Sequence, residues 1–197
     1  MIFYFLFIFF LFLKIERNLF SVSLKNITGE KRSSYKKLEE TKKKEEEKRE
    51  EKKVEIIETY QTKIGKEIKE ICDEAIEIIE KSIITKQESG ENKIFFQKIK
   101  ADCFRVKAEV SNHYERKLYG EESQKIYEKA IKWSEDELSN THPLRLSLCL
   151  NYSVLCFDIL NRPDLACAVS KNAFDKAISS RNYFFLFFLF FFVLFFI

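Results

Sequence analysis

Residues 54–84, VEIIETYQTKIGKEIKEICDEAIEIIEKSII, decide the fold class of this chain. Apolar residues recur there at alternating three- and four-residue steps, and one polar residue, Gln61, stands on the same seam. The apolar members are Val54, Ile57, Ile64, Ile68, Ile71, Ala75 and Ile78. This spacing places them along one face of a helix. Because such a seam is buried against other helices, the stretch predicts a helix inside an all-α domain.

The flanking sequence shows further helical signals. Residues 14–38 carry one helical face of Ile15, Leu19, Val22, Asn26 and Gly29. Residues 93–112 form the next predicted helix, and a polar stretch up to Gly120 separates it from 121–138. Helices over 143–160 and 163–179 each begin at a proline, which the first turn of a helix tolerates. We therefore expect an array of antiparallel helices with short connections.

Charge is concentrated in the middle of the chain. The 197 residues include 34 basic and 31 acidic ones, a net charge of +3 that gives no case for a nucleic-acid partner. Residues 42–53, KKKEEEKREEKK, are charged at every position and predict a solvated helix extension or loop, with a binding tail as the alternative. Only four glycines and two prolines occur, which favours long helices.

The two ends are apolar and rich in phenylalanine. Residues 1–13, MIFYFLFIFFLFL, and 183–197, YFFLFFLFFFVLFFI, hold six and nine of the 21 phenylalanines and no charge. Both are shorter than the roughly 20 residues of a membrane-spanning helix, and neither has the polar face of a core helix. A membrane anchor is one interpretation; low-complexity sequence outside the domain is the one we favour. We therefore divide the chain into residues 1–13, a helical domain over 14–180, and residues 181–197.

No pattern of a catalytic or metal site is found. The five cysteines, Cys72, Cys103, Cys149, Cys156 and Cys167, are odd in number and contain no CxxC pair. We expect them to be buried apolar residues in a reducing compartment. Phosphate-cradling glycine loops and nucleophile or metalloprotease motifs are missing from the sequence. We therefore expect a protein that is no enzyme and needs no cofactor.

Three cations are candidates for binding an anion. Lys25 and Arg32 are seven residues apart, so they share one face of the first helix. Arg105 stands on a largely apolar helix, where an arginine either pairs with an acid or binds an anion. If the three converge, they form a pocket for a dianionic phosphate. Ordinary surface charge is the alternative interpretation.

A second candidate group lies on the helix over 143–160. Asn151, Val154 and Asp158 share a face at spacings of three and four residues, and Leu150 is their neighbour. The amide of Asn151 offers a donor and an acceptor, which suit the backbone of an extended peptide. An incidental asparagine on a helix face explains the pattern equally well.

Five segments resemble 14-3-3 proteins, in the same order along the chain. They are residues 17–22 (RNLFSV), 98–105 (KIKADCFR), 141–146 (THPLRL), 150–154 (LNYSV) and 173–178 (AFDKAI). The resemblance covers about residues 16–179. It implies a protomer with a concave, amphipathic groove for peptides carrying phosphoserine or phosphothreonine, and dimers of nine-helix protomers.

The resemblance also assigns residues to the groove and to the dimer contact. Lys25, Arg32 and Arg105 match the phosphate-binding positions, and Asn151 matches the asparagine that binds the peptide backbone. Asp158 stands where the family has a glutamate in the groove. The matched apolar groove positions are Leu19, Val22, Leu150 and Val154. The matched dimer-interface positions are Tyr60, Lys63 and Glu67.

The chain also departs from the family. Val106 replaces a tyrosine whose hydroxyl helps to hold the phosphate, a loss of about 1.5–3 kcal/mol. The Phe-rich ends stand in place of the first two helices and the last one, so the domain looks truncated at both ends.

We therefore expect a cytoplasmic adaptor for phosphorylated client proteins, with weakened binding and with homo- or heterodimerisation in doubt. A non-functional fragment or gene-model artefact remains an alternative. A helical adaptor associated with the membrane through its Phe-rich ends is a second one.

Overall fold

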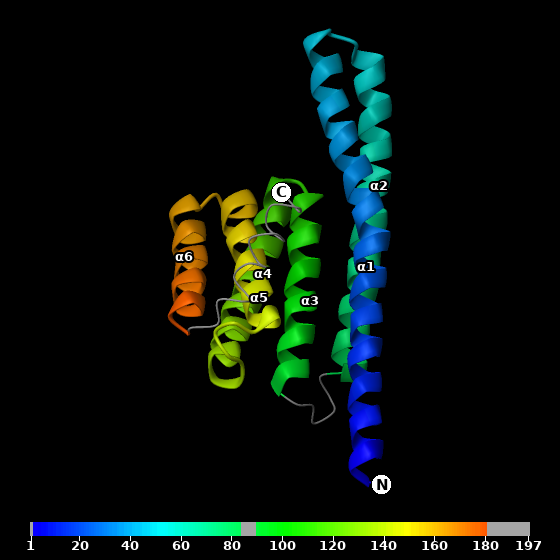
Figure 1. Ribbon diagram of the computed structural model, residues 1–197. Helices are drawn as coiled ribbons and strands as arrows, with labels where there is room; N and C mark the ends of the chain where they lie inside the picture. The colour runs from blue at the N-terminus through cyan, green and yellow to red at the C-terminus, as the bar shows by residue number, and fades with distance from the viewer. Residues whose placement is uncertain (1, 84–89, 181–197) are drawn as a thin grey trace. The chain divides into compact units, whose positions relative to one another are not determined.

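The computed structural model describes residues 2–83 and 90–180, which form helices joined by short connections and contain no strand (Figure 1). The chain divides into two compact units, residues 1–75 and 76–197. The elements are α1 (Ile2–Glu47), α2 (Glu51–Ile78), the π-helical turn η1 (Ile79–Ile83), α3 (Gly90–Glu109), α4 (His113–Glu137), α5 (Pro143–Val154), the π-helical turn η2 (Leu155–Ile159) and α6 (Pro163–Ser179). The all-α class predicted from the sequence is confirmed.

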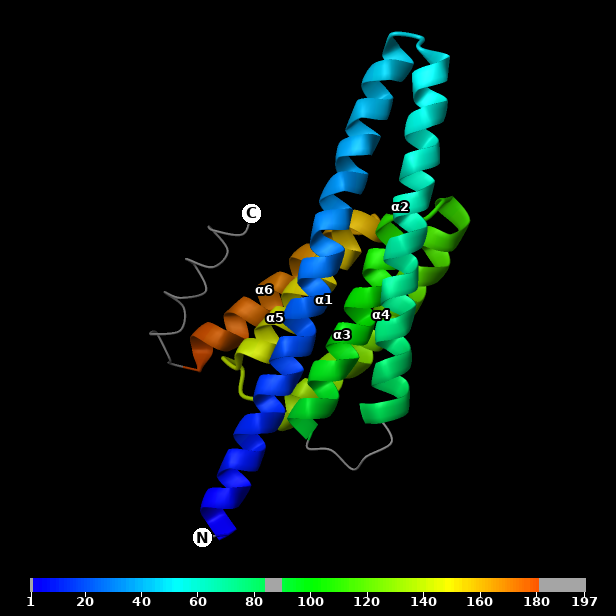
Figure 2. The same cartoon turned by 90° about the vertical axis from the view of Figure 1, so that its right-hand side faces the viewer.

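The first unit is an antiparallel hairpin of α1 and α2 (Figures 1 and 2). Residues 42–47 of the charged run end α1, residues 48–50 form the turn, and the last three open α2. The predicted extension and the predicted loop are therefore both present. Ion pairs join the two helices, with Lys31 Nζ 2.6 Å from Glu67 Oε2 and Lys42 Nζ 2.5 Å from Glu58 Oε1.

α1 begins at Ile2, twelve residues before the predicted start at Lys14. The helix continues through the Phe-rich residues because neither glycine nor proline interrupts them. Among the described residues, no helix is long and apolar enough to cross a membrane. The second Phe-rich segment, 181–197, lies outside the described residues. The domain limits at residues 14 and 180 stay a prediction.

The seam predicted for α2 is partly buried, and its last member is wrong. Four of its residues are half-buried: Val54, Ile57, Ile64 and Ile71. Ile68 and Ala75 are buried, whereas Ile78 is 47% exposed and its neighbour Ile79 is fully buried. A seam spaced at 3.5 residues drifts around a helix that has 3.6 residues per turn. By the end of α2 this drift has brought Ile79, the first residue of η1, to the buried face.

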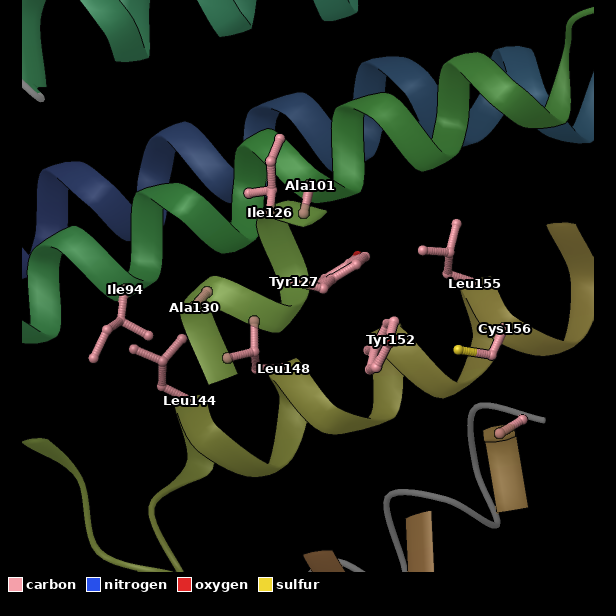
Figure 3. Close-up of a cluster of buried hydrophobic side chains, with 11 residues drawn as sticks. Ile94, Ala101, Ile126, Tyr127, Ala130, Leu144, Leu148, Tyr152, Leu155 and Cys156 are labelled. Carbon is pink, nitrogen blue, oxygen red and sulfur yellow. The ribbon is translucent and has the colours of Figure 1, made fainter. Parts of the chain in front are cut away.

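The second unit packs α3, α4, α5 and α6 around one apolar cluster (Figure 3). The buried members come from each of these helices and from η2. They are Ile94 and Ala101 of α3, Ile126, Tyr127 and Ala130 of α4, Leu144, Leu148 and Tyr152 of α5, Leu155 and Cys156 of η2, and Ala166 of α6. This cluster fixes the three helices that carry the polar site described below.

α4 begins eight residues before the predicted position. Asn112 caps it, since its Oδ1 accepts a hydrogen bond of 3.0 Å from the backbone N–H of Glu115. The polar residues before Gly120 are therefore the first turns of a helix, and Gly120 is a packing position. A Cβ built there would lie 2.9 Å from Cγ2 of Ile159.

The cysteines follow the prediction with one exception. All five are free thiols, and Cys72, Cys103, Cys149 and Cys156 are buried. Cys167 is exposed on α6, so the expectation of a buried residue is wrong there. Ala166 faces the core, and the next residue along a helix turns about 100° away from it.

We expect Gly120→Ala to destabilise the chain by about 1–3 kcal/mol, because the new methyl group would overlap Ile159 and crowd Leu160. Gly29→Ala is the matched control: it lies within α1, and a Cβ there meets no atom within 4 Å. That substitution should stabilise by up to about 1 kcal/mol. Urea unfolding followed by circular dichroism measures both, and equal effects would contradict the packing role of Gly120.

Candidate functional site

Arg105 lies on α3 with its side chain only 12% exposed, between two acids of the same helix. Its Nη1 donates to Oε1 of Glu109 at 2.6 Å, and its Nη2 lies 3.7 Å from Oδ1 of Asp102. The acids stand three residues before and four after the arginine, the spacings at which helical side chains meet. Of the two outcomes predicted for Arg105, pairing with an acid is therefore present.

The pairing leaves one donor of Arg105 unused. Its Nε is buried and has no hydrogen-bond partner among the described residues. Burial by itself lowers the pKa of a guanidinium, but Tyr127, Asp102 and Glu109 outweigh it and raise the pKa of Arg105. The side chain thus stays charged, with an orientation set by two acids and with one buried donor that has no partner among the described residues.

Asp102 joins three helices at one carboxylate. Its Oδ2 accepts from Nζ of Lys98 at 2.8 Å, and its Oδ1 accepts from the hydroxyl of Tyr127 on α4 and from Nδ2 of Asn151 on α5, the latter at 2.8 Å. Burial raises the pKa of a carboxyl group, yet Lys98 and Arg105 lower the pKa of Asp102 from 3.8 to about 2. The group is therefore an anion at neutral pH.

Arg105 and Asn151 thus meet at the same oxygen, Oδ1 of Asp102. They are predicted binding residues from different helices, and the structure of the second unit brings them together. Asn151 is half-buried, and its Oδ1 forms no hydrogen bond within the described part of the chain. An acceptor and a cation are therefore adjacent, which suits a ligand with both a backbone and an anionic group.

The apolar neighbours of Asn151 differ in exposure. Leu150 is 42% exposed, Val154 is half-buried, and Asp158 is exposed within η2. The π-helical turn that begins at Leu155 has more residues per turn than an α-helix, so the spacing of seven residues is no longer an α-helical repeat between Asn151 and Asp158. The role of Asp158 in a peptide-binding groove stays a prediction.

The candidate residues of the first unit lie along α1. The helix is unbroken from Lys25 to Arg32, so these residues are two turns and about 10 Å apart along one face. Lys25 is exposed and Arg32 is half-buried. Leu19 and Val22 are 64% and 52% exposed.

The three positions predicted for a dimer interface lie on α2. Tyr60 is 59% exposed and Lys63 is exposed, whereas Glu67 is half-buried and pairs with Lys31. The hydrogen bond from Lys31 lowers the pKa of Glu67. Their role in a dimer stays a prediction.

Sequence reasoning missed four members of the polar cluster: Lys98, Asp102, Glu109 and Tyr127. The three on α3 could have been found, because they stand three or four residues from Arg105 or from one another. Tyr127 gives no such signal, since its hydroxyl reaches Asp102 from another helix.

Taken together, the described residues define an all-helical protein whose polar cluster is suited to binding. The 14-3-3 protein family profile matches residues 12–183. The chain is 42% identical over 164 residues to the 14-3-3 protein homolog 2 of Schistosoma mansoni, covering 83% of this chain and 76% of that protein. It is 40% identical to the 14-3-3-like protein 2 of Caenorhabditis elegans and to the mouse 14-3-3 protein theta, of which it covers 65% and 66%. The chain belongs to the 14-3-3 family.

This membership confirms the resemblance found in the sequence. The family consists of adaptor proteins without enzymatic activity, in agreement with the expectation that the chain is no enzyme. The chain spans about two thirds of the length of the worm and mouse relatives.

The lowered pKa of Asp102 makes a prediction about acid stability. A carboxyl group whose pKa is lower in the folded than in the unfolded state stabilises the folded protein at any pH above the unfolded-state pKa. This stabilisation is lost as the pH falls through the folded-state pKa. With an unfolded-state pKa of 3.8 and a folded-state pKa of about 2, Asp102 should lose about 1.5–2 kcal/mol of its contribution to the free energy of unfolding between pH 5 and pH 2.5. Asp102→Asn lacks this titration, so its stability difference from the wild type should shrink by that amount in urea unfolding. A constant difference across this range would contradict the assignment.

Proposed function

We propose that this chain is a regulatory adaptor that binds client proteins through peptides carrying phosphoserine or phosphothreonine, without chemical change. The phosphate is bound by Lys25, Arg32 and Arg105. The observation that carries this proposal is the state of Arg105: a charged guanidinium, held by Asp102 and Glu109, with its Nε unused. Family membership supports the same function.

The charges on α3 explain why cations from α1 belong to the proposal. Lys98 and Arg105 balance Asp102 and Glu109, so this cluster has no net charge to attract a phosphate dianion. Lys25 is exposed and has no ion pair among the described residues, so its charge is uncompensated. Lys25 and Arg32 therefore supply attraction, and Arg105 supplies directed hydrogen bonds.

The proposed peptide contacts combine an amide with apolar side chains. Asn151 hydrogen-bonds to the peptide backbone through its side-chain amide. Leu19, Val22, Leu150 and Val154 contact peptide side chains, three of them being more than a third exposed. Val106 is buried and has no hydroxyl, so the tyrosine contact of the family is lost here.

The location and the association with other chains are also proposals. We place the adaptor in the cytoplasm, which accords with five free thiols in one chain. Tyr60, Lys63 and Glu67 are the proposed contacts with a second 14-3-3 chain, and the exposure of the first two accords with this role.

Lys25→Ala tests the proposal with little risk to the fold, because the side chain is exposed. We expect the affinity for a phosphoserine peptide to fall about tenfold or more, since a charge-assisted bond is worth about 1.5–3 kcal/mol. Fluorescence anisotropy with phosphorylated and unphosphorylated forms of one peptide measures the effect.

The matched control is Lys171→Ala, which removes an equally exposed helical lysine from α6. It should leave both affinities unchanged. If the wild type binds the two peptide forms equally, the proposed function is wrong.

A further inference from the structure

We propose that Asp102 is the positioning residue of this site: it fixes the side-chain amide of Asn151 and couples it to Arg105, without touching the peptide. The inference rests on the proposed function, and it concerns a residue to which the comparisons with known proteins assign no role. It starts from the chemistry of one carboxylate with four neighbours.

An ionised carboxylate can only accept hydrogen bonds. Asn151 must therefore turn its NH₂ group toward Asp102, as the 2.8 Å contact between Nδ2 and Oδ1 requires. This leaves the carbonyl oxygen and the second N–H of the amide for the peptide backbone. Without Asp102 no hydrogen bond within the described residues would distinguish the oxygen of the amide from its nitrogen, so the amide could present either group to the peptide.

The carboxylate is itself held at both oxygens. Lys98 donates to Oδ2 from the same helix, and the hydroxyl of Tyr127 donates to Oδ1 from α4. Tyr127 is fully buried, and its ring lies 5.8 Å from that of Tyr152, the neighbour of Asn151. The apolar core thus sets the position of Asp102 through Tyr127, and the carboxylate of Asp102 in turn orients the amide of Asn151.

Arg105 depends on the same oxygen from the other side, with Nη2 at 3.7 Å. Glu109 holds Nη1 of this arginine and forms no hydrogen bond with Asn151 in the described part of the chain. The two acids are therefore a natural comparison. Both orient Arg105, but only Asp102 also orients Asn151.

A double-mutant cycle separates these roles through the affinity for a phosphoserine peptide. We expect Asp102→Asn to weaken binding about tenfold in the wild type, but by a clearly smaller factor when Asn151→Ala is already present. Glu109→Gln should weaken binding by the same factor with or without Asn151→Ala. If Asp102→Asn also costs the same factor in both backgrounds, the coupling is refuted.

Tyr127→Phe keeps the buried ring and removes only the hydroxyl, so it tests the same chain of contacts should Asp102→Asn fold poorly. We expect a smaller loss of affinity that again shrinks when Asn151→Ala is present. An equal loss in both backgrounds would overturn the proposal.

A second measurement uses the free protein and is independent of the peptide. In ¹⁵N-labelled chain, the Asn151 side-chain NH₂ signals are assigned by their disappearance in Asn151→Ala. One proton should be shifted downfield by its bond to the carboxylate. Asp102→Asn should clearly reduce this shift, because an amide oxygen is a weaker acceptor than a carboxylate, while Glu109→Gln retains it. Signals unaffected by Asp102→Asn would overturn the positioning role, whereas equal binding of both peptide forms would overturn the proposed function.

Discussion

The second unit depends on how it accommodates a charged guanidinium that is almost buried. Removing an ion from water costs several kcal/mol unless partners replace the water. Arg105 finds these partners on its own helix, three residues before it and four after it. Because both acids are local, the helical conformation of α3 by itself brings them next to Arg105. Tyr127 on α4 adds a favourable interaction from a second helix.

Tertiary packing then adds what the helix cannot supply. Next to Asp102, the hydroxyl of buried Ser123 on α4 donates to the carbonyl of Ala101 at 2.8 Å, which sets the register of α4 against α3. One turn further along α4, Tyr127 reaches Asp102. The side chain at 101 is only a methyl group, so the two helices can approach closely at this level. The polar cluster is thus an extension of the apolar core.

Much of the helical fold could be predicted from the sequence, because helical periodicity and prolines at helix starts are local signals. The start of α4 was missed because the polar residues after it show no clear apolar period, although Asn112 followed three residues later by Glu115 is a local helix-start signal. The exposure of Ile78 was missed because the drift of a seam accumulates along a helix. For the site, the sequence pointed to Arg105 and Asn151 separately, and the resemblance grouped them. Their link through Asp102 and Tyr127 joins positions 25 to 49 residues apart, which no local pattern reports.

The charge balance of the cluster explains how such a site can discriminate. A fully compensated Arg105 attracts anions weakly at long range, but its fixed orientation favours a ligand whose oxygens match its donors. Lys25 has the opposite character: it is exposed and uncompensated, so its attraction acts at a distance and is screened by salt. An exposed cation alone would bind any acidic peptide. A fixed but compensated guanidinium alone would bind few peptides of any kind. In the proposed phosphopeptide site, the geometry of Arg105 would therefore separate a phosphoserine from a run of glutamates, while the on-rate would depend on the exposed charge of Lys25.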